Sequence, residues 1–133
     1  MRICVMTVVA DGVGGMQRHT HDLVRGLVAR GHDVEVVCPA GRGLEDGLHG
    51  ARWHLVPPLS RPADFAGAEW LARSLAEFRR AQQRRPFDVI HSEGSSALAP
   101  VRAREVQGAG GWGRGRGPVL VVEFHGNAAG LAR

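Results

Sequence analysis

MRICVMTVVADGVGGMQRHTHDLVRGLVARGHDVEVVCP, residues 1–39, changes its hydrophobic pattern twice. Residues 2–9 are almost continuously apolar and rich in β-branched side chains, which is typical of a strand buried on both faces of a parallel sheet. Residues 16–30 place their apolar side chains three or four positions apart, which predicts an amphipathic helix that Gly31 ends. Residues 33–38 predict a second buried strand. The segment is therefore expected to form a βαβ unit, in which a right-handed crossover makes the two strands parallel.

The rest of the chain continues this alternation. Short apolar runs predict three more strands, at residues 52–56, 87–91 and 118–124. Two further helices are predicted, at residues 64–85 and at residues 95–107, the latter capped by serines. The apolar stripe of the first of these runs through Phe65, Ala68, Leu71, Ala72, Leu75 and Phe78. Residues 108–117 are expected to be a glycine-rich loop. Together these elements predict an α/β fold with a Rossmann-like, doubly wound parallel sheet.

The length of 133 residues suits one domain, and 44% hydrophobic residues can fill its core. The last predicted strand needs a covering helix, and the residues after Asn127 are too few to form one. We therefore expect residues 1–133 to be an incomplete amino-terminal domain that lacks its carboxy-terminal partner. Neither a bilayer-spanning apolar run nor a signal peptide is evident, so a cytoplasmic location is expected.

The chain carries a formal net charge of +4, and all 17 of its basic residues are arginine. These arginines are spread along the sequence without interleaved aromatic residues, which argues against nucleic-acid binding. One cluster lies in the helix predicted at residues 64–85, and comprises Arg79, Arg80, Arg84 and Arg85. Trp70 lies off the apolar stripe of the same helix. The cluster is either an ordinary solvated face or, with an outward Trp70, a site of peripheral contact with an anionic membrane, and both interpretations stay open.

Ligands of open α/β sheets bind beyond the carboxyl ends of the strands, so the residues that follow each strand are the most informative. Asp11-Gly12-Val13-Gly14-Gly15-Met16-Gln17 follows the first strand and leads into a helix, where backbone amides can bind phosphate. A plain strand-to-helix turn is the alternative explanation for its glycines. His91 and Glu93 follow the fourth predicted strand, and His125 follows the fifth.

A dinucleotide-binding site is weakly supported. Gln17 stands where the third glycine of G-x-G-x-x-G would be, and the second strand ends in Val37-Cys38-Pro39 without an acidic residue for a ribose. A P-loop is excluded because the chain contains no lysine. A fragment of an NAD-dependent oxidoreductase is therefore the least favoured of the functional hypotheses.

Three blocks of sequence, GGMQRHTHDLVRGLVARGHDVEVVCP, FDVIHSEG and PVLVVEFHGN, together resemble the amino-terminal domain of glycosyltransferase family four. The resemblance implies a retaining enzyme of the GT-B fold. It also implies that Gly14 and Gly15 approach the diphosphate of a nucleotide-sugar donor, and that His125 contacts the transferred sugar as the catalytic candidate. The first loop is also similar to that of phosphatidylinositol mannosyltransferases, which implies acceptor binding by Asp11 and Gln17.

The resulting hypothesis is the acceptor-side part of a glycosyltransferase that acts on a nucleotide-sugar donor and a lipid or carbohydrate acceptor. The nucleotide sugar is a substrate, so no cofactor is expected. His91 and Glu93 are predicted either to support the site from behind or to be structural, and no protein nucleophile is assigned. The alternative hypothesis is a Rossmann-like module that binds a nucleotide or sugar phosphate without catalysis.

No metal site is predicted. His19 and His21 are two residues apart on a predicted helix and should point in different directions, so we interpret them as solvated residues at its start. Cys4 and Cys38 fall in predicted buried strands and are interpreted as structural thiols.

Overall fold

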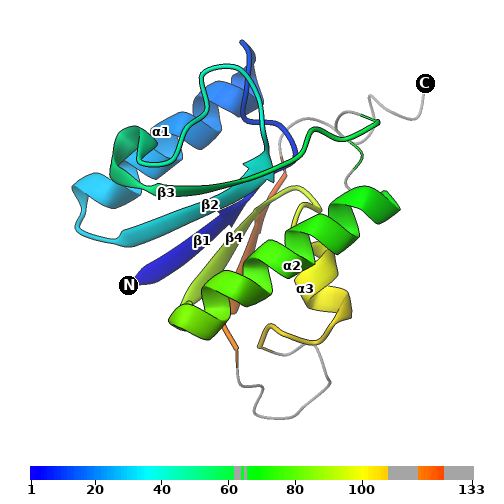
Figure 1. The fold of residues 1–133 in the computed structure, drawn as a ribbon. Coiled ribbons are helices and arrows are strands. Elements are labelled where there is room, and N and C mark those ends of the chain that lie inside the picture. The colour runs from blue at the N-terminus through cyan, green and yellow to red at the C-terminus, as the bar shows by residue number, and fades with distance from the viewer. Residues whose placement is uncertain (62–63, 65, 108–116, 125–133) are drawn as a thin grey trace.

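The computed structural model describes residues 1–61, 64, 66–107 and 117–124, which form one parallel sheet with helices on both faces (Figure 1). Its five strands lie in the order β3-β2-β1-β4-β5, and each is parallel to its neighbours. The strands are β1 (Arg2–Met6), β2 (Asp33–Pro39), β3 (Arg52–Val56), β4 (Val89–Glu93) and β5 (Val119–Glu123). The predicted Rossmann-like, doubly wound sheet is confirmed.

The strand order reverses between β1 and β4, which are neighbours at the centre of the sheet. Strands β2 and β3 follow on one side of β1, whereas β5 follows on the far side of β4. The loops after β1 and β4 therefore leave the sheet in opposite directions. This reversal point, at the carboxyl ends of the strands, is where open α/β sheets bind their ligands.

Helix α1 (Gly15–Ala29) covers one face of the sheet. Its fully buried Val24 belongs to a core cluster with Val5, Val36 and Trp53, contributed by three neighbouring strands. Gly31 has a φ of +86°, a left-handed conformation that glycine adopts without strain, and it follows the helix directly. The predicted helix and its glycine end are thus confirmed.

Helix α2 (Ala68–Arg84) covers the opposite face, but not with the predicted stripe. Its buried residues are Trp70, Ser74, Phe78 and Ala81. Of the predicted stripe, Phe78 is buried, Leu71 and Leu75 are half-buried, Ala68 and Ala72 are exposed, and Phe65 lies outside the described residues. The prediction was wrong because the largest side chain, Trp70, sets the buried face of the helix. Ser74 and Phe78 follow at successive intervals of four residues and therefore lie on the same face.

The helix predicted at residues 95–107 is shorter than expected. Helix α3 spans only Leu98–Arg102, and the turn before it is held by Ser92, whose Oγ accepts a hydrogen bond from the Ala97 amide at 2.9 Å. Arg104 adopts a φ of +58°, which no regular helix contains. A 3₁₀ turn, η1 (Leu48–Gly50), completes the described elements between β2 and β3.

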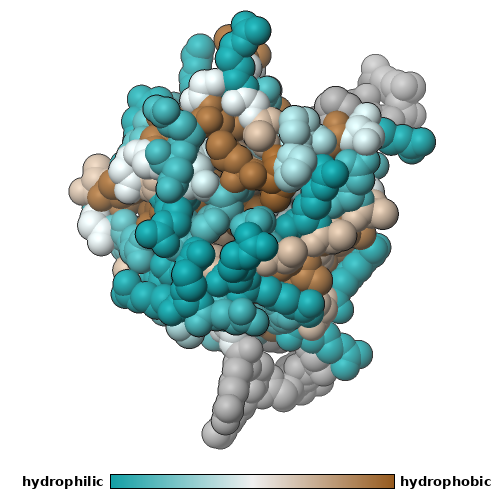
Figure 2. Space-filling view, in the orientation of Figure 1, coloured by the Kyte–Doolittle hydropathy of each residue, from teal (hydrophilic) through white to brown (hydrophobic). Residues whose placement is uncertain are grey.

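The membrane interpretation of α2 loses its structural basis. Trp70 is fully buried, and its indole N–H donates to the Ser96 carbonyl at 2.8 Å, so the expectation of an outward aromatic was wrong. Each arginine of the cluster forms an ion pair, Arg79 with Glu105, Arg80 with Glu77, Arg84 with Glu35 and Arg85 with Asp33. Figure 2 shows a mostly hydrophilic surface around the lower-left end of α2, and a more apolar surface toward its other end. In the described part of the chain, no helix has the length and apolarity that a bilayer crossing requires.

Both cysteines are free and buried in the core. Cys4 packs on the α2 side of the sheet with Met6 and Phe78, and Cys38 packs on the α1 side with Val24. Burial raises the pKa of Cys38 to about 12 and raises that of Cys4 still further. Both side chains are therefore protonated thiols that fill space, as the sequence predicted.

Candidate functional site

The loop after β1 enters α1 through two glycines. Gly14 caps the helix in an extended conformation with φ −179° and, being glycine, has no side chain to hydrogen-bond to the helix start. The Gln17 side chain folds back over Gly14, where a Cβ atom would overlap its amide. Gly15 opens the helix, and a Cβ atom there would meet nothing. The first turn of α1 thus presents backbone amides beside a loop that is open at Gly15.

Asp11 lies on the far side of the same loop. Its exposed side chain lies against Gly41 in the loop after β2, where a Cβ atom would overlap it. The neighbouring Ala10 carbonyl contacts His21 Nε2 at 2.9 Å, and His21 Nδ1 contacts His49 Nε2 at 2.8 Å. Partial burial, together with Arg25 and His21, lowers the pKa of His49. His21 therefore has a structural role, because it connects the loop after β1 to His49. The prediction that it is a solvated residue was wrong.

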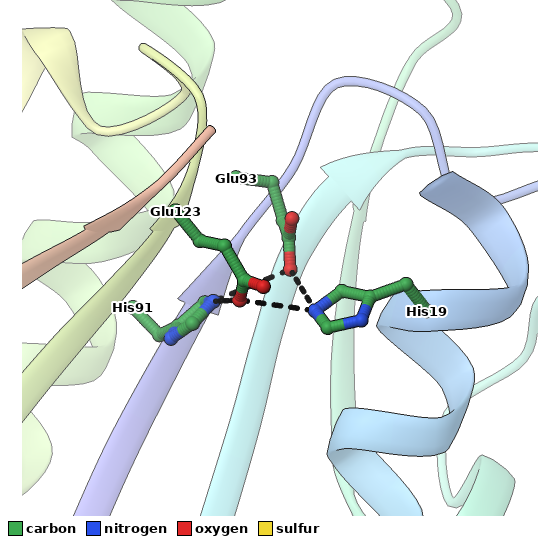
Figure 3. Close-up of side chains that lie close together, drawn as sticks. All are labelled: His19, His91, Glu93 and Glu123. Atoms are coloured by element: carbon green, nitrogen blue, oxygen red, sulfur yellow. Dashed lines mark hydrogen bonds and ion pairs between the residues drawn. The ribbon is translucent and has the colours of Figure 1, made fainter. Parts of the chain in front are cut away.

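Four polar side chains meet at the carboxyl edge of the sheet, and we call them the His–Glu cluster (Figure 3). The members are His19, His91, Glu93 and Glu123. His19 Nε2 lies 3.0 Å from Glu123 Oε2 and 3.7 Å from Glu93 Oε1. His91 Nε2 lies 3.2 Å from Glu123 Oε2 and 3.3 Å from Glu93 Oε1. Two imidazoles thus converge on the same pair of carboxylates.

Strand pairing explains this convergence. Glu93 and Glu123 are register partners in the parallel pair β4 and β5, so their side chains stand next to each other. His91 precedes Glu93 by two residues and therefore points to the same face of the sheet. That face is the one under α1, which contributes His19 from its second turn. The cluster therefore joins α1, β4 and β5.

The cluster lies partly below the protein surface. Glu93 is 0% exposed and His91 12%, whereas His19 and Glu123 are 35% and 38% exposed. His91 Nε2 is a buried atom that forms no hydrogen bond within the described structure. A buried carboxylate requires neutralisation, and the described residues supply imidazoles for it.

The predicted site residues are brought together only in part. Gly14, Gly15 and Gln17 adjoin one another, Asp11 borders the same loop, and His91 and Glu93 share the cluster. His125 lies outside the described residues. The prediction that His19 is a solvated residue was wrong, because its ring contacts Glu123 and Glu93. Sequence analysis missed Glu123, whose one visible signal is its place at the end of the last predicted strand, two residues before His125.

A cavity at the opposite edge of the sheet is another candidate for the site. It has a volume of about 530 Å³ and opens at the amino ends of the strands, lined by Arg2, Asp33, Glu35 and Arg84 among others. These side chains form ion pairs with one another, including Arg2 with Glu35 at 2.9 Å. We therefore treat the cavity as part of a structural ion-pair network and place the candidate site at the carboxyl edge.

Comparisons with known proteins bear on the fold and the family of this chain. The structure is similar to sucrose-phosphate synthase from Thermosynechococcus elongatus, with a TM-score of 0.66 at 16% sequence identity. The match covers 94% of this chain but only 33% of the synthase chain, so it supports the fold alone. No curated protein sequence matches this chain. The sequence model of Glycosyltransferase Family 4 matches residues 13–132, which include Gly14, Gly15 and all four residues of the His–Glu cluster. The match covers nearly the full length of the chain, which therefore belongs to glycosyltransferase family 4.

Proposed function

We propose that this chain supplies the acceptor-side part of a retaining glycosyltransferase. The enzyme would transfer a sugar from a nucleotide-sugar donor to a lipid or carbohydrate acceptor. Membership of family 4 supports the general reaction, since the family acts on sugar donors and acceptors. The nucleotide sugar is itself consumed, so the proposal needs no separate cofactor.

The observation that carries the proposal is the start of α1. Its capping residue is Gly14 and its first residue is Gly15, so the capping position itself offers no side chain to the first amides. These amides carry partial positive charge at the reversal point of the sheet, which suits the diphosphate of a nucleotide sugar. Negative charge grows on that diphosphate as the glycosidic bond breaks, so fixed donors at this position would stabilise the transition state.

The remaining roles follow from the family resemblance and from position. Asp11 and Gln17 flank the glycine loop and are proposed to bind the acceptor. His125 is proposed to contact the transferred sugar. His91 and Glu93 lie behind the loop in the His–Glu cluster, where they would hold α1 in place relative to β4 and β5. None of these roles requires a covalent bond between the sugar and this chain.

The substitution Gly15→Asp tests the diphosphate site. An aspartate at the first position of a helix favours the helix dipole, and Gly15 has open space around it, so the fold should keep its stability. The same carboxylate should repel a diphosphate. In the protein expressed from its full gene, we expect donor affinity, measured by calorimetry with nucleotide sugars and free nucleoside diphosphates, to fall about tenfold or more.

Ala76→Asp provides the matched control, because it adds the same charge at an exposed position on α2. Donor affinity should be unchanged in this variant. Equal affinity in Gly15→Asp and the unaltered protein would contradict the diphosphate site. A protein that binds the nucleotide sugar but forms no product across lipid and carbohydrate acceptors would favour the non-catalytic binding module.

A further inference from the structure

We infer that the His–Glu cluster binds a divalent transition-metal ion, with Zn²⁺ as the best fit. Imidazole nitrogen and carboxylate oxygen are both common zinc ligands. The cluster supplies two of each, and its four ligand atoms all lie within 4.8 Å of one another. The proposed glycosyl transfer does not itself require this metal, so the two proposals can fail separately.

The spacing of the ligand atoms suits a tetrahedral ion. Zinc bonds to nitrogen and oxygen at about 2.0–2.2 Å, which places tetrahedral ligands about 3.3–3.6 Å apart. The four nitrogen-to-oxygen separations in the cluster are 3.0, 3.2, 3.3 and 3.7 Å. The two remaining separations, nitrogen to nitrogen and oxygen to oxygen, are at most 4.8 Å, so shifts of up to about 1 Å would centre a tetrahedral ion among the four side chains. All of these separations involve the Nε2 atom of an imidazole, so both rings face the same centre (Figure 3).

The charges of the cluster also favour a dication. Two carboxylates with two neutral imidazoles carry two negative charges, which one divalent ion balances. Glu93 is fully buried, and a buried carboxylate is stabilised by cationic partners. His91 Nε2, a buried atom without a hydrogen bond in the described structure, would gain a partner as a metal ligand. Geometry and charge thus indicate the same kind of ion.

A site with four protein ligands is closed, which is typical of structural rather than catalytic zinc. This one would join the second turn of α1 to the ends of β4 and β5, across the reversal point of the sheet. Strand β5 is the outermost described strand on its side, and Val119 and Val121 are 46% and 44% exposed. A metal would therefore fix a weakly covered strand to the helix that begins at Gly15.

The test is metal binding by the tag-free protein after treatment with a chelator. Titration with Zn²⁺ followed by calorimetry should show one tight site per chain, and thermal unfolding should shift to a higher Tm with the ion bound. Titration with Co²⁺ should give the intense visible absorption of a tetrahedral complex. His19→Gln and Glu123→Gln should each weaken binding by about 100-fold or more. Both residues are partly exposed, so these variants should fold.

His32→Gln and His21→Gln are the matched controls. His32 contacts the amino-terminal amine at the opposite edge of the sheet, and His21 pairs with His49 outside the cluster. Both variants should bind Zn²⁺ like the unaltered protein. Absence of Zn²⁺ binding by the unaltered protein would overturn the inference. So would an unaltered affinity in His19→Gln and Glu123→Gln, or loss of the site in His32→Gln. None of these measurements depends on glycosyl transfer, so none bears on the proposed function.

Discussion

The two edges of the sheet bury charge in different ways. At the amino edge, Arg2 and Glu35 are 5% and 2% exposed and lie 2.9 Å apart. Arg2 also donates to the backbone carbonyls of Arg85 and Ala81, and its guanidinium lies over the Phe87 ring. At the carboxyl edge, the buried Glu93 has imidazoles as its described partners.

The partner chemistry accounts for the contrast in role. A guanidinium is permanently charged and offers five donors in a fixed plane, so it satisfies a buried carboxylate without any ligand. An imidazole is charged only when protonated, and its neutral form is a good metal ligand. At the amino edge, Glu35 thus has the guanidinium of Arg2 as well as the imidazole of His54, whereas the described ion-pair partners of Glu93 at the carboxyl edge are imidazoles, the composition of a binding site. The edge with the cavity of about 530 Å³ is therefore the structural one.

Among the predictions, substitution of Arg2 at the amino edge should have the largest effect on the stability of the fold. Arg2→Met leaves Glu35 buried beside its remaining partners, His54 at 2.7 Å, Arg84 at 3.6 Å and Arg52 at 3.8 Å. Loss of one member of a buried pair typically costs about 3–5 kcal/mol, so we expect the free energy of unfolding, measured with urea, to fall by that amount. Adding Glu35→Gln should restore part of it, because an amide carries no charge. A loss below about 1 kcal/mol would mean that His54, Arg84 and Arg52 are enough to stabilise the Glu35 carboxylate.

The corresponding variant at the carboxyl edge should change function and leave stability nearly intact. If His125 contacts the transferred sugar, His125→Ala should lower turnover of the full enzyme by about 100- to 1000-fold, as loss of one transition-state contact commonly does. Single-turnover assays and thermal unfolding measure the two properties separately. His32→Ala, at the amino edge, should keep normal turnover. Near-normal turnover in His125→Ala would remove His125 from the site.

Disruption of an exposed ion pair should have the smallest effect on stability, and it gives a reference value for the effects at both edges. Arg79 and Glu105 are 50% and 27% exposed and join α2 to the segment after α3. Solvent screens such pairs, so a double-mutant cycle with Arg79→Ala and Glu105→Ala should give a coupling of about 0.2–1 kcal/mol. Zinc affinity should not change. A coupling as large as that expected for Arg2 would show that exposure does not explain the contrast.

The sequence was sufficient for the order and type of the elements, because the buried strands are apolar on both faces and α1 has a regular stripe. It was not sufficient for the orientation of α2. The leucines and alanines of α2 predicted one apolar face. The helix instead buries the face that carries Trp70, whose indole N–H donates to the Ser96 carbonyl. Such a choice depends on tertiary packing, which periodicity does not describe.

The candidate site shows the same limit more sharply. The glycine loop and the His91–Glu93 pair are local features that a sequence displays. Glu123 joins them only because β5 pairs with β4 in the register that places it beside Glu93. His19 joins them because α1 crosses over that position. Contacts between residues more than a hundred positions apart, such as His19 with Glu123, follow from the fold and not from spacing.

The two buried cysteines lie in different layers of the interior, Cys4 beneath α2 and Cys38 beneath α1. Because almost no thiolate forms at either position near neutral pH, alkylating reagents react with each sulfur only after its own layer opens. The two thiols are therefore natural probes of local unfolding, one for each face of the sheet. The order in which an alkylating reagent modifies them reports which helix detaches first.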